Sequence, residues 1–297
     1  MDIPTEPRSP MASPLHSDSV HSWRLRSRTL TWGKFPLLMG IVNVTPDSFS
    51  DGGQWNDPQA AVAHGIELWQ QGADILDIGG ESTRPYSQPV SEAEELRRTI
   101  PVIRELAEKT QAIISVDTSK ARIAMEAIAA GAEIINDVTG LTGDSQMERV
   151  AVETGAGVCV MHMQGTPQSM QDNPSYVDVV AEVKAYLESR RRHLVQIGVV
   201  AEKIALDPGL GFGKTHLHNW ELIGRIREFH DLGCPLLIGH SRKGFIAKLS
   251  GDGMPARDVG TLVVSLRLAE QGVGVLRLHE VSTTRLAFRI WEAIGGE

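Results

Sequence analysis

The stretch Met39-Gly-Ile-Val-Asn43-Val-Thr-Pro46-Asp-Ser-Phe-Ser-Asp51-Gly-Gly53 sets the pattern from which the fold is predicted. Residues 37–44 form a short apolar run rich in β-branched side chains, which is typical of a buried strand. After Asn43 the composition changes to turn residues, because Pro46 restricts the backbone and the Asp and Ser beside it bond nearby backbone groups. A buried strand that ends in a polar loop is how α/β enzymes present reactive groups. Taken alone, this stretch is explained equally well as an ordinary strand-to-helix loop.

The same unit of apolar strand, polar loop and amphipathic helix recurs along the chain. The sequence predicts strands at residues 37–43, 75–78, 112–117, 134–138, 158–163, 203–207, 235–239 and 273–279. It predicts helices at residues 58–71, 92–109, 119–130, 177–196 and 260–271. An unbroken βα alternation predicts an α/β fold, a single (β/α)8 TIM barrel over residues 23–297. A doubly wound sheet is the alternative, because the strands alone do not establish closure.

The remaining bulk properties restrict the class of protein. Residues 1–22 hold four prolines among polar and charged residues, which predicts a disordered tail, and residues 23–32 predict a hairpin capping the barrel bottom. The formal net charge of −8 argues against a nucleic-acid partner. No apolar run is long enough to span a membrane. Cys159 and Cys234 lie far apart in apolar runs, as expected for reduced thiols in a cytoplasmic protein.

Acids and an amide follow the third, fourth and sixth predicted strands, where a barrel places its active site. They are Asp117, Asn136 and Asp207. Carboxylates that face one cavity repel each other unless a ligand or a cation such as Lys243 supplies positive charge. Such a set suits a flat heterocycle with an aminopyrimidine edge, whose N–H groups need acceptors. Singly, Asp117 could equally be a helix N-cap, and Asn136 and Asp137 could cap the next turn. His162, flanked by methionines, is expected to pack in the core.

Cationic and hydroxyl side chains follow the second, seventh and eighth predicted strands. They are Thr83 with Arg84, the run Ser241-Arg242-Lys243, and Arg277 with His279. Forked guanidinium donors and hydroxyls are suited to binding phosphate groups. Arg277 and His279 are two residues apart, so on a strand they face the same side. The sequence therefore predicts an anion site beside the acids.

Together these segments resemble, in order, the motifs of the dihydropteroate synthase family of pterin-binding TIM barrels. The similarity covers residues 37–290 and rests on Asn43-Val-Thr-Pro-Asp-Ser-Phe-Ser-Asp51, Glu81-Ser-Thr-Arg-Pro85, Val-Asp117-Thr, Asn136-Asp137-Val, Met161-His-Met-Gln-Gly-Thr-Pro, Asp207-Pro-Gly-Leu-Gly-Phe212-Gly-Lys, Ser241-Arg-Lys243 and Arg277-Leu-His279. It implies that 6-hydroxymethyl-7,8-dihydropterin diphosphate and 4-aminobenzoate, the small-molecule substrates, condense to 7,8-dihydropteroate and diphosphate. It also implies that the protein is a homodimer and that sulfonamides bind to it as inhibitors.

The resemblance further implies a role for individual residues. The pterin would be held by Asp117, Asn136, Met161, Asp207, Gly211 and Lys243. The diphosphate would be held by Thr83, Arg84, Arg242, Arg277 and His279, and 4-aminobenzoate by Phe49, Pro85, Phe212 and Ser241. Asn43 would bind Mg²⁺ carried on the diphosphate. Asp51, Lys243 and Arg277 would act in catalysis, with Asp51 steadying positive charge on the pterin methylene; no nucleophile is needed when a C–O bond ionises.

Two positions depart from the family pattern, and two other functions stay open. Tyr86 stands where the family usually has Gly, beside the 4-aminobenzoate pocket, and Glu280 stands where Asp is usual.

Methyltetrahydrofolate:corrinoid methyltransferases share the fold and the acids, but they need no cationic clamp for diphosphate. An inactive pterin-binding homologue is the non-enzymatic alternative, and the intact Asn43 and Lys243 count against it.

Overall fold

The computed structural model describes residues 21–45, 58–82 and 87–295, and eight parallel strands form its centre. They are β3 (Leu37–Asn43), β4 (Ile75–Gly79), β5 (Ile113–Asp117), β6 (Ile134–Asp137), β7 (Gly157–Met161), β8 (Ile204–Asp207), β9 (Leu237–Gly239) and β10 (Val275–Leu278). They pair in the order β8-β7-β6-β5-β4-β3-β10-β9, and a bridge between Leu206 and Leu236 joins the two ends of that order. This nearly closed ring confirms the TIM barrel and excludes a doubly wound sheet, whose strand order reverses at its centre.

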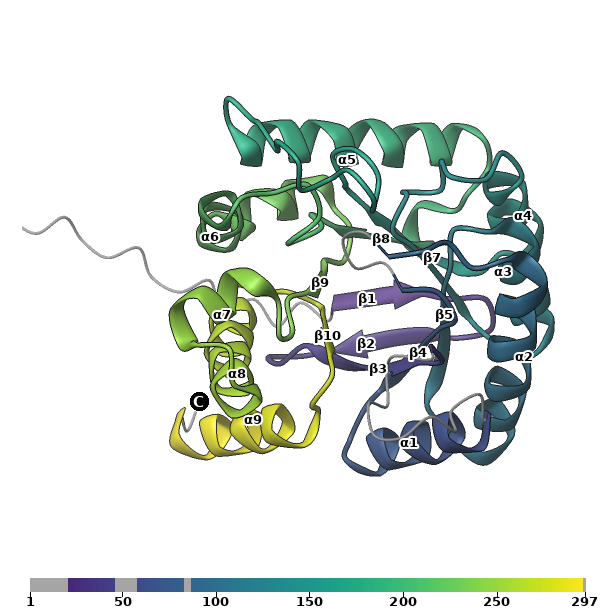
Figure 1. Ribbon diagram of the computed structural model, residues 1–297, viewed down its shortest axis with the longest axis horizontal. Coiled ribbons are helices and arrows are strands. Elements are labelled where there is room, and N and C mark those ends of the chain that lie inside the picture. The colour runs from purple at the N-terminus through teal and green to yellow at the C-terminus, as the bar shows by residue number, and fades with distance from the viewer. Residues whose placement is uncertain (1–20, 46–57, 83–86, 296–297) are drawn as a thin grey trace, which may run out of the picture.

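Helices form a ring around the strands (Figure 1). They are α1 (Pro58–Gln70), α2 (Glu92–Lys109), α3 (Ala121–Ala129), α4 (Met147–Thr154), α5 (Val179–Gln196), α6 (His216–Gly224), α7 (Gly244–Ser250), α8 (Met254–Glu270) and α9 (Ser282–Gly295), with 3-10 turns η2 (Ala201–Lys203) and η3 (Ile226–Leu232). The helix predicted to start at residue 260 starts instead at Met254. A Cβ on Gly260 would lie 2.5 Å from Ile246, so this glycine lets α8 pack closely on α7. Among the described residues no helix has the length and apolarity of a membrane span.

The two-residue period of the strands sorts their side chains into two groups. Outward residues such as Leu38, Leu76 and Ile114 pack in the main core with the helices. Inward residues near the strand starts form a second apolar cluster: Met39, Ile75, Ile113, Ile134, Cys159, Ala205, Leu237 and Val275. Two positions further along five of these strands the inward residues are polar: Asp77, Ser115, Asn136, Asp207 and Arg277. The barrel interior therefore changes from apolar to polar toward its carboxyl end, where the site lies.

The hairpin predicted near the start of the chain is present. Strands β1 (His21–Arg24) and β2 (Thr29–Trp32) pair in antiparallel register and lie across the barrel in Figure 1. Trp23 is fully buried against the inward apolar cluster, and its indole N–H donates to the Lys203 carbonyl at 2.9 Å. The hairpin therefore closes the amino-terminal end of the barrel, as predicted. The predicted tail lies outside the described residues except for His21 and Ser22, which belong to β1.

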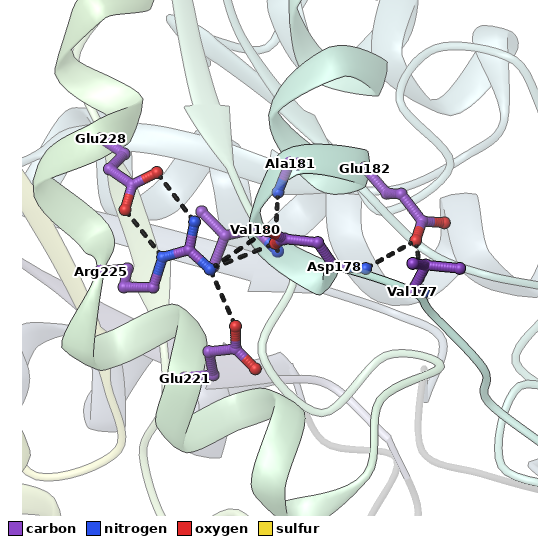
Figure 2. A network of polar contacts seen from close by, with 8 residues as sticks. All are labelled: Val177, Asp178, Val180, Ala181, Glu182, Glu221, Arg225 and Glu228. Carbon is purple, nitrogen blue, oxygen red and sulfur yellow. Dashed lines mark hydrogen bonds and ion pairs between the residues drawn. The ribbon is translucent and has the colours of Figure 1, made fainter.

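A surface network of charges anchors the start of α5 to the end of α6 (Figure 2). Asp178 caps α5 by accepting hydrogen bonds from two backbone N–H groups of its first turn, both at 3.0 Å. Arg225 donates to Asp178 at 3.2 Å, to Glu221 at 2.9 Å and to Glu228 at 2.7 Å. Ion pairs this exposed contribute little to stability. The network orients two helices, and we assign it a structural role.

Candidate active site

Arg277 of β10 holds together the inward polar residues of the barrel. Its Nε donates to Asp77 Oδ2 at 2.6 Å, and its Nη2 donates to Asp117 Oδ2 at 2.7 Å. Asn136 Nδ2 donates to the same Asp77 oxygen at 3.1 Å. Side chains from β4, β5, β6 and β10 thus form one hydrogen-bonded group. We call these four residues the Arg277 cluster.

The Arg277 cluster is buried and carries more acceptors than its own donors satisfy. Asp77 is fully buried and Asp117 is 8% exposed. Burial raises the pKa of Asp117 to about 7, against the opposing charge of Arg277. Asp77 Oδ1 and the nearby barrel hydroxyl Ser115 Oγ have no hydrogen-bond partner among the described residues. The cluster can therefore accept hydrogen bonds from a ligand that brings N–H groups into the barrel.

Two more charged residues, Asp207 at the end of β8 and Lys243 at the N-cap of α7, lie near each other. Asp207 Oδ1 accepts a hydrogen bond from the backbone N–H of Gly209 at 2.7 Å. Burial raises the pKa of this carboxyl. Met161 on β7 is paired with Asp207 in the strand register. Lys243 Nζ donates to a backbone carbonyl of the loop after β8 and lies 4.2 Å from the centre of the Phe212 ring. Burial lowers the pKa of Lys243 to about 8, with Asp207 opposing. Gly211, at φ +82°, leaves room for the lysine, because a Cβ there would lie 3.0 Å from its Cδ.

Three of the residues predicted to bind diphosphate, Arg242, Arg277 and His279, lie at or just after the ends of β9 and β10, together with Ser241. Ser241 Oγ accepts the backbone N–H of His279 at 3.2 Å and lies 3.0 Å from its ring Nδ1. Arg242, the next residue, has a left-handed backbone φ of 59° and forms an ion pair with Asp258 of α8 at 2.6 Å. The two strand ends are thus joined directly. These predicted anion-binding residues lie next to the Arg277 cluster, because Arg277 and His279 belong to one short segment.

Asn43 is the last residue of β3, half-buried at the carboxyl end of the barrel. Among the described residues, no three His, Cys, Asp or Glu side chains are placed to hold a metal ion. Mg²⁺ prefers oxygen ligands, keeps several waters, and is commonly bound through substrate phosphates with one or two protein oxygens. The amide oxygen of Asn43 therefore fits a Mg²⁺ that arrives on a phosphate ligand better than it fits a cation bound by the protein alone.

Six residues of the sequence prediction, which follow β3 and β4 in the sequence, lie outside the described residues. They are Phe49, Asp51, Thr83, Arg84, Pro85 and Tyr86. Their assigned roles stay predictions, as do the ligand assignments of the described residues. What the structure establishes is which of those described residues lie together.

The hydrogen bonds of the strand ends show which acids and amides cap a turn or a helix. Asp137, rather than Asn136, caps the turn after β6, because its Oδ1 accepts from Thr139 N at 2.8 Å and from Thr139 Oγ1 at 2.7 Å. Asp117 caps no helix, since Lys120 is the N-cap residue of α3. Of the adjacent pair on β6, one side chain stabilises a turn and the other enters the Arg277 cluster.

Asp77 is a site residue that the sequence prediction missed. The signal was present, since Asp77 is a single acid inside the apolar strand β4. A buried carboxylate without a partner carries a large desolvation cost, so an acid at such a position implies a partner somewhere in the fold. No local pattern around Asp77 identifies that partner as Arg277.

Lys214 is the second charged residue that was missed, and it explains the environment of His162. Lys214 is buried, and its Nζ lies 2.9 Å from His162 Nδ1 and 3.0 Å from the Phe212 carbonyl. Burial lowers the pKa of His162 to about 3, so the neutral ring accepts a hydrogen bond from the lysine. His162 also packs edge-on against Tyr186 at 4.9 Å. The expectation that His162 is a buried core histidine is confirmed.

Comparison with known proteins shows the family of the chain. Residues 39–279 match the family of pterin binding enzymes. The dihydropteroate synthase of Escherichia coli (strain K12) is 47% identical over 258 residues, which cover 87% of this chain and 91% of that protein. The structure of Xanthomonas albilineans dihydropteroate synthase with 4-aminobenzoic acid has a TM-score of 0.87 and 42% identity, covering 94% of this chain and 100% of that one. That of Yersinia pestis dihydropteroate synthase in a sulfonamide drug complex has a TM-score of 0.87 and 40% identity, covering 93% and 100%. This chain belongs to the dihydropteroate synthases, a group of transferases within the pterin-binding enzyme family.

Proposed function

We propose that this chain condenses 6-hydroxymethyl-7,8-dihydropterin diphosphate with 4-aminobenzoate to give 7,8-dihydropteroate and diphosphate. The amine nitrogen of 4-aminobenzoate forms a bond to the pterin methylene carbon and loses a proton. The C–O bond of that carbon breaks, and diphosphate leaves with the electron pair. The observation that carries this function is the Arg277 cluster, whose buried acceptors share one arginine of β10. His279 lies two residues beyond Arg277 and contacts Ser241, the residue before Arg242, so the predicted anion-binding residues lie beside the acceptors. A pterin-dependent methyltransferase needs the acceptors but has no diphosphate to hold.

The acids would hold the aminopyrimidine edge of the pterin and stabilise the charge that develops during the reaction. Their carboxylate oxygens accept N–H groups, and the ammonium of Lys243 can donate to a carbonyl oxygen of the ring. Burial raises the pKa of both Asp117 and Asp207, so a ligand that donates to them favours their ionised form. Ionised carboxylates around the pterin stabilise positive charge on its methylene carbon as the C–O bond breaks.

The cationic residues would hold the diphosphate. Arg277 uses Nε and one Nη2 hydrogen for the two acids, so its Nη1 group and the second Nη2 hydrogen remain for the anion. It can therefore bind diphosphate without releasing Asp77 or Asp117. Mg²⁺ held through Asn43 would supply further charge neutralisation for the leaving group.

Diphosphate release tests the reaction and its metal dependence together. Protein incubated with the pterin diphosphate, 4-aminobenzoate and Mg²⁺ should release diphosphate in equal amount to the dihydropteroate formed. EDTA should abolish turnover and added Mg²⁺ should restore it, because the leaving group loses part of its charge neutralisation. Failure to form dihydropteroate would reject the proposed reaction. Undiminished turnover in EDTA would reject Mg²⁺ and the role assigned to Asn43.

We also propose that the protein is a homodimer that associates through α8 and α9. Val259 and Val263, four residues apart on α8, are 63% and 62% exposed. Leu286, Ile290 and Ile294 repeat the same spacing along α9 and are also exposed. The two helices lie side by side at one edge of the barrel (Figure 1). Contiguous exposed apolar surface marks association sites, and a two-fold dimer covers the same patch on both subunits.

Charge introduced into this patch should separate the subunits. Val263→Glu places a carboxylate where each subunit would bury an apolar side chain, so the dimer should become a monomer in light scattering coupled to size-exclusion chromatography. Val195→Glu on α5, where the native valine is also exposed, is the matched control and should leave the mass unchanged. A wild-type monomer, or a Val263→Glu dimer, would refute this interface.

We propose that the protein works in the cytoplasm. Cys159 and Cys234 are both free and buried. Free thiols at these positions suit a reducing compartment, because secreted proteins more often pair their cysteines.

A further inference from the structure

Helix α8 holds the backbone of Arg242 in an uncommon conformation. The φ angle of Arg242 is 59°, a left-handed value that non-glycine residues rarely adopt. Its backbone N–H donates to Thr261 Oγ1 at 3.0 Å, and its carbonyl accepts from Arg257 Nη1 at 3.2 Å. Both partners belong to α8. Local backbone strain persists where the surroundings determine it, and such residues occur often at functional sites.

The same helix also holds the side chain of Arg242. Arg242 Nε donates to Asp258 Oδ1 at 2.6 Å, and Nη2 donates to Oδ2 at 3.0 Å. This two-point contact occupies one edge of the planar guanidinium. The other edge, formed by Nη1 and the second hydrogen of Nη2, points away from Asp258 because the group is planar. Among the described residues, Nη1 has no hydrogen-bond partner.

We propose that Asp258 is a positioning residue that orients the open edge of Arg242 toward the substrate diphosphate. This inference rests on the proposed function, which supplies the anion. A guanidinium edge matches two phosphate oxygens, and a side chain held in its bound rotamer loses less freedom on binding. Asp258 uses a different edge from the one a diphosphate needs, so it holds the arginine without competing for the anion.

Calorimetry with inorganic diphosphate and Mg²⁺ on the full chain tests the proposal. Asp258→Asn should weaken diphosphate binding by about fivefold to tenfold, the range for leaving one long side chain mobile before binding. The KM for the pterin diphosphate should rise by a similar factor. The affinity for a pterin without diphosphate and the KM for 4-aminobenzoate should stay within about twofold. Asp258→Glu keeps the charge and should recover most of the loss.

Glu270→Gln is the matched control. Glu270 lies on the same helix and pairs with Arg267 at 3.0 Å, both side chains being exposed, so the variant removes the same charge without touching Arg242 or its partners. Its diphosphate affinity should equal that of the wild type. Unchanged or tighter diphosphate binding by Asp258→Asn would overturn the proposal, as would equal losses in the Asn and Glu variants at position 258. A wild-type protein that forms no dihydropteroate would instead overturn the proposed function.

Discussion

Replacing Arg277 with Met should destabilise the protein by about 3 kcal/mol and abolish turnover. Asp77 and Asp117 are buried, and Arg277 is the cation that contacts both. Removing one member of a buried ion pair costs about 3–5 kcal/mol, because the other member stays buried with its charge unpaired. The lower end applies here, since the Arg277 side chain is 20% exposed. Methionine keeps the apolar stem, so the change isolates the loss of charge.

The destabilisation should depend on pH with a defined sign. In the wild type, burial raises the pKa of Asp117 to about 7 while Arg277 opposes the rise, so the variant should raise it further. A carboxyl with a folded-state pKa above its unfolded value of about 3.9 contributes stability at low pH that is lost as pH rises through the folded pKa. The variant should therefore lose more stability relative to wild type at about pH 8 than at about pH 6. Denaturant unfolding at both pH values measures this difference.

Arg285→Met is the control for the general effect of removing an arginine. Arg285 pairs with Asp74 at 2.6 Å, but both side chains are partly exposed, so its loss should cost about 1 kcal/mol or less. The double variant Arg277→Met/Asp77→Asn removes one of the two unpaired charges and should recover part of the stability. Equal losses from the two arginine variants, or a deficit that grows toward low pH, would contradict the ion-pair explanation.

Pterin affinity should fall by about 2–4 kcal/mol when Asp207 is replaced by Asn, the range for an unsatisfied buried polar group. Asp207 Oδ1 accepts the backbone N–H of Gly209 at 2.7 Å, which leaves Oδ2 for a ligand. Asparagine can keep the bond to Gly209 only by presenting its NH2 group at the other position. That group would then face the N–H donors of the pterin. Calorimetry with a pterin ligand measures the change.

Asp137→Asn provides the comparison at a neighbouring strand end. Asp137 is buried, but its side chain caps the turn through Thr139 and takes no part in the Arg277 cluster. This variant should lose stability while the folded protein keeps its pterin affinity. Equal pterin affinities of the wild type and Asp207→Asn would show that Asp207 serves only to cap the turn at Gly209.

The order of strands and helices could be predicted from the sequence because it depends on local patterns. Apolar runs of four to seven residues, turn residues after them and amphipathic segments of helical period are each contained in a short window. The strand predicted at residues 37–43 and the helix predicted at residues 92–109 agree with β3 and α2. The sequence prediction places the start of α8 six residues too late, because glycine is unfavourable inside a helix. The close approach of Gly260 to Ile246 on α7, which favours a glycine there, cannot be seen in the local sequence.

By itself, the sequence determined which strand ends carry acids and which carry cations, since each belongs to one short segment. The tertiary structure alone decided how these groups pair. Arg277 contacts Asp77 and Asp117, which lie 200 and 160 residues earlier in the chain. These contacts exist because the barrel brings β10 beside β3, so that a side chain on β10 reaches β4 and β5 through the interior. A local pattern can state that a buried acid needs a cation, but only closure of the sheet determines which cation it meets.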